Sequence, residues 1–290
     1  MLARAFAHGL KKRDMANRAR QYRPKHDPHN GLLNFKASTP LPGYWRYFPS
    51  PDLAPYVEHF WTIEWNLPEP ALRETLPYPS AHIILEPGVA QLGGVRTKKF
   101  SRVLEGRGRV LGTKFWPGGL RPFLAQPMSA YTDRVLPLHA VFGARARNLD
   151  RRALQHADHH AAIAVVEEFL RALQPRADET LALVRATAQR IADDREMKQV
   201  EQLAAHVALG VRTLQRLFGD YIGVSPKWMI RRYRLQEAAE RMAASVALDW
   251  AQIALDLGYA DQAHFSRDFK RLIGKSPADY FKTLAPMPRP

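Results

Sequence analysis

The chain has 290 residues, of which 46% are hydrophobic and 10% aromatic, and this length and composition are typical of a folded protein with two domains. The absence of cysteine excludes disulfides, thiolate metal sites and cysteine nucleophiles, and no uncharged apolar run is long enough to predict a transmembrane helix. The net charge of +15 favours a polyanionic partner.

Much of the positive charge lies at the N-terminus. Residues 1–40 contain nine Lys or Arg and two Asp or Glu, a net charge of +7 (9 − 2). They also contain few apolar residues that could form a core. We expect a disordered basic arm, with a phosphate-binding arm and an Arg-rich transit peptide as alternatives.

A β-rich domain is predicted over residues 41–145. Short apolar runs, His59–Trp65, Ala81–Leu85 and Val110–Phe115, are separated by clusters of proline and glycine. This pattern predicts a small β-barrel or sandwich, for which a cupin-like barrel is one candidate. Such a domain suits a regulatory role in which it binds a small effector. Three tryptophans are candidates for the walls of an effector pocket, and the alternative is that they belong to the hydrophobic core: Trp61, Trp65 and Trp116.

The pattern changes to helical spacing over residues 146–194, where we expect a helical connector of two amphipathic helices, the first of them stopped at Pro175. His156 and His160 lie four residues apart on that first predicted helix, a spacing that can hold a metal ion. No H-E-x-x-H signature accompanies them. A solvated helix face is therefore the preferred interpretation, and we expect no metal and no cofactor.

Residues 195–285 contain an internal repeat. Gln202-Leu203-Ala204 matches Gln252-Ile253-Ala254 at an offset of 50 (252 − 202). Gly223-Val224-Ser225-Pro226 matches Gly274-Lys275-Ser276-Pro277 at an offset of 51 (274 − 223). The second copy therefore carries one extra residue, which we place in the turn between its two short helices.

Each copy predicts a helix-turn-helix unit. In the first, a helix at Val200–Val207 and a helix at Val211–Tyr221 are joined by a turn that contains Gly210; in the second, the turn ends at Asp261, a good N-cap. A helix that starts at Pro226 separates the copies, and its Arg231, Arg232 and Arg234 face either phosphates or water. The polar residues predicted to face outward on the second helix of each copy are candidate DNA readers, because Arg pairs with guanine and Gln with adenine: Arg212, Thr213, Gln215, Arg216, Gln262, His264, Ser266 and Arg267.

These motifs resemble a known family. The stretch from Gly258 to Lys270, followed by Gly274 and Ser276-Pro277, is similar to the signature of AraC/XylS-type transcriptional regulators, and Leu214–Phe218 is similar to the matching part of the first motif. The resemblance implies two helix-turn-helix motifs joined by a helix and set in successive major grooves. Two departures are Gly210, where the family commonly has a Ser-type cap, and the pair Asp261 and Ala263 in the second motif, which offer little or no attraction to a DNA groove. Three further stretches, Tyr47–Pro51, Val57–Trp61 and Gly112–Gly118, make residues 44–142 similar to an uncharacterised β-rich domain found ahead of such DNA-binding regions.

We therefore expect an α+β protein of two domains: the β-rich regulatory domain and an all-α double helix-turn-helix domain over residues 195–285, followed by a tail at 286–290. The expected function is that of a sequence-specific bacterial transcription regulator, cytoplasmic and nucleoid-associated, rather than an enzyme. Double-stranded DNA is the expected partner, with RNA polymerase, a small-molecule effector and a second copy of the chain as further candidates, and no membrane. The alternatives are a constitutive DNA-binding protein whose N-terminal domain only dimerises, and an enzyme fused to a DNA-binding module.

Overall fold

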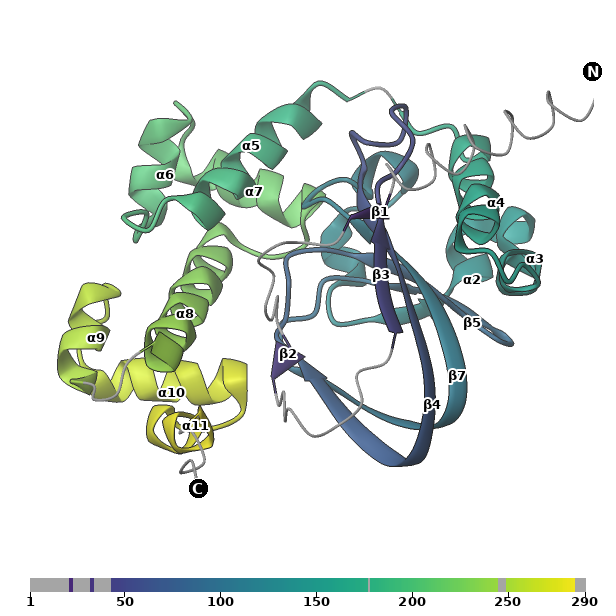
Figure 1. Ribbon diagram of the computed structural model, residues 1–290. Coiled ribbons are helices and arrows are strands. Elements are labelled where there is room, and N and C mark those ends of the chain that lie inside the picture. Colours follow the sequence, from purple (N-terminus) through teal and green to yellow (C-terminus); the bar gives the residue numbers. More distant parts are fainter. Residues whose placement is uncertain (1–20, 23–31, 34–42, 177, 245–248, 285–290) are drawn as a thin grey trace, which may run out of the picture.

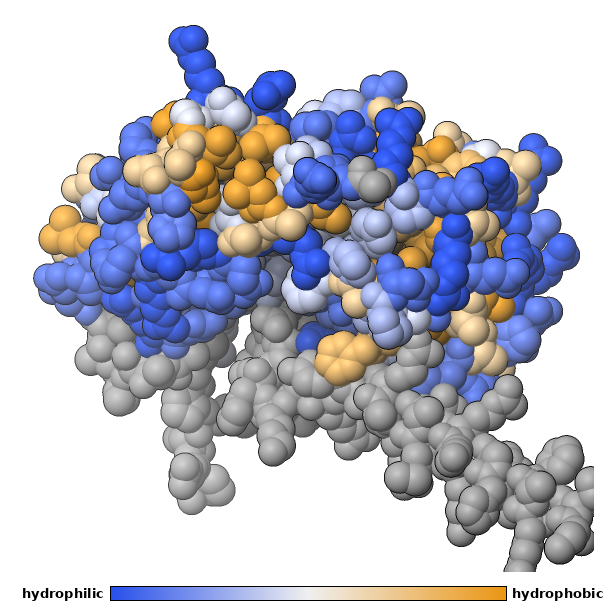
Figure 2. Space-filling model, turned by 90° about the horizontal axis from the view of Figure 1, so that it is seen from above, coloured by the Kyte–Doolittle hydropathy of each residue, from blue (hydrophilic) through white to orange (hydrophobic). Residues whose placement is uncertain are grey.

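The structure, a computed structural model, describes residues 21–22, 32–33, 43–176, 178–244 and 249–284. Strands make up the first half and helices the second (Figure 1). None of the described helices is long and apolar enough to cross a membrane. The face viewed in Figure 2 is largely hydrophilic, with hydrophobic residues in separate patches.

The described strands form one antiparallel sheet of eight strands in the order β1-β3-β4-β7-β5-β6-β8, with β2 paired to β4. Its centre is the long pair β4 and β7, which bends where the register shifts between Leu67 and Ala71 (Figure 1). The edge strands β1 and β8 are not paired with each other among these strands, so the sheet is not a closed barrel. The strands are β1 Gln21–Tyr22, β2 Leu32–Leu33, β3 Gly43–Tyr47, β4 Val57–Thr75, β5 His82–Glu86, β6 Val89–Gly93, β7 Phe100–Phe115 and β8 Val135–Pro137.

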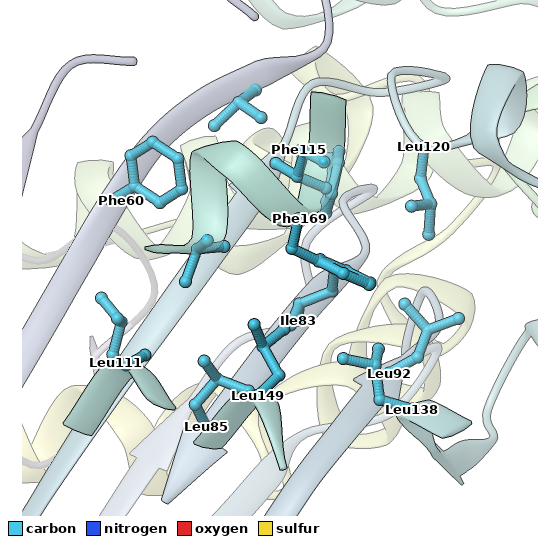
Figure 3. Close-up of a cluster of buried hydrophobic side chains, with 14 of the residues drawn as sticks. Phe60, Ile83, Leu85, Leu92, Leu111, Phe115, Leu120, Leu138, Leu149 and Phe169 are labelled. Carbon is cyan, nitrogen blue, oxygen red and sulfur yellow. The ribbon is translucent and has the colours of Figure 1, made fainter. Parts of the chain in front are cut away.

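One face of the sheet is covered by helices. Alternate side chains of the central strands point to this face because strand side chains alternate in direction, and Phe60, Ile83 and Phe115 are fully buried there. Figure 3 shows them with Leu149 and Phe169 from the covering helices. These helices are α2 Leu138–Phe142, α3 Leu149–Leu154 and α4 His159–Ala172, and the short 3-10 turns are η1 Arg121–Phe123, η2 Met128–Tyr131 and η3 Gly143–Ala146.

The C-terminal helices form two hairpins at opposite ends of one long helix, α8 (Figure 1). Helix α5 packs with the first hairpin, since Val184, Ala188 and Ile191 share its buried cluster. The second hairpin packs with the last helix around Phe265 and Phe269. The helices are α5 Thr180–Asp193, α6 Val200–His206, α7 Val211–Tyr221, α8 Pro226–Ala244, α9 Trp250–Asp256, α10 Gln262–Ile273 and α11 Pro277–Leu284.

The expected α+β fold with two domains is confirmed, and so is the all-α character of the C-terminal half. The segment expected to begin with one amphipathic helix instead forms α3 and α4, because Asp158 accepts hydrogen bonds from the backbone N–H groups of His160 and Ala161 and starts a new helix. Of the N-terminal arm, the structure describes only β1 and β2. The rest of the arm and the tail at 286–290 lie outside the described residues, and the predicted disorder of the arm stays a prediction.

Candidate nucleic-acid interface

The first hairpin is formed by α6 and α7. Leu203, Leu214 and Phe218 are buried between the two helices. The turn at residues 207–210 is tight: the backbone N–H of Leu209 donates to the carbonyl of Ala204 at 3.0 Å. Helix α7 then begins without a side-chain cap, because its N-cap residue is glycine.

The candidate readers of the first copy lie on the outer face of α7. Arg212, Gln215 and Arg216 are exposed, and Thr213 is half-buried. The buried positions, Leu214 and Phe218, are four residues apart, so the helical period leaves the readers on the opposite side. Among the described residues, no hydrogen bond or ion pair engages the two arginine side chains. These groups are available to an external partner.

The second hairpin, formed by α9 and α10, repeats this geometry with stronger capping. The Asp261 carboxylate accepts a hydrogen bond of 2.6 Å from the backbone N–H of His264, and the Asp249 carboxylate caps α9 in the same way. The turn at residues 257–261 is one residue longer than the turn of the first hairpin. The first helices of the two hairpins start 50 residues apart (250 − 200) and the second helices 51 apart (262 − 211), so the position predicted for the extra residue is confirmed.

The candidate DNA readers of the second copy differ in exposure, and one of them contacts a carboxylate of its own helix. Gln262 and Arg267 are exposed, whereas His264 and Ser266 are half-buried. The His264 Nε2 atom lies 3.6 Å from the Asp268 carboxylate, one turn along the helix. Arg267 occupies the same position in α10 as Arg216 in α7, at the offset of 51 (267 − 216). One matched arginine therefore stands on each second helix.

A buried carboxylate supports the second helix. Asp268 is 5% exposed, forms an ion pair with Arg231 of α8, whose Nε atom lies 2.9 Å from one carboxylate oxygen, and accepts a hydrogen bond of 2.7 Å from Arg271 Nη2. Burial, together with the negative charge of this carboxylate, raises the pKa of the Tyr259 hydroxyl. Sequence reasoning missed this group, although Leu217 stands at its position in the first copy (268 − 51 = 217), and that exchange of leucine for aspartate was the available signal.

Of the three arginines of α8 that were expected to face phosphates or water, two are buried and Arg231 is half-buried. Arg231 pairs with Asp268, and Arg232 is 1% exposed and donates through Nε to the backbone carbonyl of Pro77 at 2.8 Å. Arg234 is 3% exposed and donates to Glu237. The expectation was wrong for Arg232 and Arg234, because Arg232 is buried against the N-terminal domain and Arg234 is buried against Glu237 of the same helix and the backbone carbonyl of Asp194.

The tryptophans proposed as effector-pocket walls do not form one group. The side chains of Trp61 and Trp65 point to the same face of β4, where they lie over glycines of β7, so closely that a Cβ at Gly108 or Gly112 would overlap them. Trp116 lies after β7, where its Nε1 atom donates to the carbonyl of Ala54 and Arg185 stacks over its ring. The structure thus brings the first two together and sets the third apart.

The histidine pair considered for a metal does not share a helix. His156 precedes the Asp158 cap and His160 follows it. His159 lies between them in the sequence, and its Nδ1 atom is 2.6 Å from the Tyr47 hydroxyl while its Nε2 atom is 3.0 Å from Glu64 Oε1. Within the described parts of the chain, no cluster of three or more metal-ligating side chains occurs.

Two segments of the chain match known family models. Residues 203–283 match the family model described as a helix-turn-helix domain. The C-terminal domain belongs to this family. The AraC/XylS-type resemblance is thereby confirmed for the C-terminal domain, while residues 45–137 match a model described only as a domain of unknown function.

Transcriptional regulators of other bacteria match part of this chain. An uncharacterized HTH-type transcriptional regulator of Haemophilus influenzae is 36% identical over 86 residues, 30% of this chain and 28% of that protein. The HTH-type transcriptional activator RhaS of Escherichia fergusonii is 35% identical over 79 residues, 27% of this chain and 28% of RhaS. This chain thus spans little more than a quarter of the length of each of these relatives. Among solved structures, the C-terminal domain of AraT from Geobacillus stearothermophilus aligns with a TM-score of 0.33 at 26% identity, covering 37% of this chain and 88% of that one.

Proposed function

We propose that this protein is a transcriptional regulator that binds double-stranded DNA sequence-specifically through α7 and α10. One observation carries the proposal: the two second helices each present an exposed arginine at the same position of the repeat, Arg216 and Arg267. A guanidinium donates two parallel hydrogen bonds to O6 and N7 of guanine in the major groove. The names of the relatives as transcriptional regulators support the same class of function over that of an enzyme.

The placement of the two hairpins at opposite ends of α8 supports docking in two successive major grooves of one DNA face (Figure 1). Successive major grooves lie about 34 Å apart along the duplex. A single chain would then read an asymmetric site of two half-elements. The proposed readers are Arg212, Thr213, Gln215, Arg216, Gln262, His264, Ser266 and Arg267.

The N-terminal domain is the proposed regulatory part. Its contacts with the DNA-binding domain support this role: Arg121 Nε donates to Asp220 of α7 at 2.8 Å, and Thr132 Oγ1 donates to the backbone carbonyl of Gly223 at 2.5 Å. A ligand that shifts these contacts would shift the first reading helix. We include an effector, a second copy of the chain and RNA polymerase as candidate partners, and the cytoplasm as the place of action, since chromosomal DNA is there in bacteria.

The test is a selection of DNA fragments by the full-length protein, from genomic DNA of the source organism and from a random-sequence pool, followed by sequencing and measurement of affinity by fluorescence anisotropy. We expect an enriched motif of two half-elements about one helical turn apart. A ratio of specific to nonspecific affinity of ~10³ or more is typical of a regulator. Binding that shows no sequence preference at any salt concentration would contradict the proposal.

A further inference from the structure

A groove of about 330 Å³ separates the N-terminal domain from the second helix-turn-helix motif. One wall is the loop between β6 and β7, with Thr97 and Lys98, and the other walls come from α8 and α10. Its apolar surface is contributed by Trp228, Leu235 and Leu272. A volume of this size suits a small organic molecule.

The charged residues around the groove are mostly cations. Lys98, Arg231, Arg232 and Arg271 line it, against one carboxylate, Asp268. That carboxylate is already held by Arg231 and Arg271 at 2.9 and 2.7 Å. The groove therefore keeps a surplus of positive charge that its own lining does not balance.

Arg232 is the decisive member of this set. Its side chain is 1% exposed, its Cζ atom lies 4.0 Å from the ring centroid of Tyr78 and 4.5 Å from that of Tyr233, and its Nε atom donates to the backbone carbonyl of Pro77. Within the described residues, its Nη1 and Nη2 atoms have no hydrogen-bond acceptor. A buried cation with unpaired donors is costly unless an anion balances it.

We propose that this groove binds a small organic anion, one whose carboxylate or phosphate accepts hydrogen bonds from Arg232 while its apolar part lies against Trp228, Leu235 and Leu272. Lys98, exposed at the rim, adds long-range attraction. The forked guanidinium suits both anions, because each offers two oxygens to parallel N–H donors. The inference goes beyond the proposed function by giving the effector a chemical class and a place between the domains rather than inside the sheet.

An anion bound in the groove would contact both the N-terminal domain and the second helix-turn-helix motif. The loop that carries Lys98 belongs to the N-terminal domain, whereas Arg271 and Leu272 belong to α10, the second reading helix. A bound anion would tie these elements together and change how α10 meets DNA. Binding itself needs no DNA, so it can be measured separately from the proposed regulator function.

The experiment titrates the full-length protein without DNA by calorimetry, with benzoate and phenyl phosphate as probes and benzamide as the neutral analogue of benzoate. We expect saturable binding of at least one anion and none of benzamide. Arg232→Gln should weaken binding about tenfold or more. Because loss of a buried arginine can unfold the protein, the second variant is Lys98→Glu, for which we expect about threefold weaker binding.

The matched control is Lys227→Glu, which reverses the charge of another exposed lysine, one on α8 that does not line the groove. Unchanged affinity in this control, with weaker binding in Lys98→Glu, supports the proposal. Three results overturn it: no saturable binding of either anion, benzamide binding as tightly as benzoate, or equal losses in the two lysine variants. Weaker DNA binding by Lys98→Glu without any binding of the two anions would show that the groove serves DNA phosphates instead.

Discussion

Arg232 Nε donates a hydrogen bond of 2.8 Å to the backbone carbonyl oxygen of Pro77, and this bond joins the helix between the two motifs to the N-terminal domain. Apolar side chains of the N-terminal domain also pack against each of the two hairpins. Leu76 is 7% exposed in the cluster of the second hairpin, and Val95 is 1% exposed in the cluster of the first. The N-terminal domain thus contributes one side chain to the core of each motif, so the two motifs are held in one orientation by residues outside the repeat.

This arrangement predicts motif-specific effects of two alanine substitutions. Leu76→Ala should lower the free energy of unfolding by about 2–5 kcal/mol and increase hydrogen exchange mainly in α9 and α10. Val95→Ala should lower it by about 2 kcal/mol and increase exchange mainly in α6 and α7. Hydrogen exchange followed by mass spectrometry on the full chain checks both, and each variant is the control for the other. The same exchange pattern in both variants would show that the contacts are not specific to one motif.

The matched arginines on α7 and α10 give the second prediction. Arg216→Ala and Arg267→Ala should each weaken binding to the selected DNA site by ~1–3 kcal/mol, because each would remove a bidentate contact with a base. Lys282→Ala, at an exposed position of α11, is the control and should leave the affinity unchanged.

Anisotropy titrations on specific and scrambled duplexes distinguish two kinds of contact. Loss on the specific duplex alone indicates base reading. An equal loss on both duplexes, with a salt slope lowered by about 1, indicates phosphate contact. If neither substitution changes the affinity for either duplex, the docking of α7 and α10 in the grooves is excluded.

The C-terminal domain could be predicted from the sequence because its signals are local. The 50 and 51 offsets place both pairs of helices, and the caps at Asp261, Ser225 and Ser276 act within three residues of themselves. The bent sheet was harder, since the short apolar runs belong to strands as long as the 19 residues of β4. A closed barrel cannot be told from an open sheet by alternation alone, because both need the same pattern of side chains.

The interior contacts of α8 could not be predicted for a different reason. Arg232 and Pro77 are 155 residues apart, and Arg234 donates to the backbone carbonyl of Asp194, 40 residues away. A charged residue on a helix faces water in most sequences, so only the tertiary structure shows that these arginines are buried. For the same reason the sequence indicated the helices α7 and α10 but not the groove between α8, α10 and the loop that carries Lys98.

The unequal N-terminal caps of α7 and α10 give the third prediction. Asp261→Ala removes the acceptor for the backbone N–H of His264 and should lower the free energy of unfolding by ~1 kcal/mol. Asp261→Asn keeps an acceptor at the same position and should cost much less. Gly210→Ser adds a cap to α7 at a site with no atom within 4 Å of an added Cβ, and should raise the free energy by a few tenths of a kcal/mol. Urea unfolding checks all three, and equal losses for the alanine and asparagine variants would contradict the assigned cap.

The buried histidine of β5 gives a prediction about pH. Burial lowers the pKa of the His82 imidazole from 6.5 to about 3, and the positive charge of Lys114 acts in the same direction. Below about pH 6.5 the His82 imidazole therefore binds a proton in the unfolded chain but not in the folded protein. The free energy of unfolding consequently falls as the pH falls from 6.5 toward 3. His59 has a lowered pKa for the same reason and contributes to the same fall.

His82→Gln removes one of these two groups. Between pH 6.5 and pH 5 the slope of the unfolding free energy should decrease by up to about 1.4 kcal/mol per pH unit relative to the unmodified chain, the limit for one proton. The measurement is urea unfolding across this range. This pH range lies above the range in which the Glu58 carboxylate takes up a proton. The pKa of Glu58 is lowered from 4.5 to about 2, so its stabilising effect is lost only as the pH falls below about 4.5. His206→Gln, at an exposed position of α6, is the control, and an unchanged slope in His82→Gln would show that the imidazole is protonated in the folded protein.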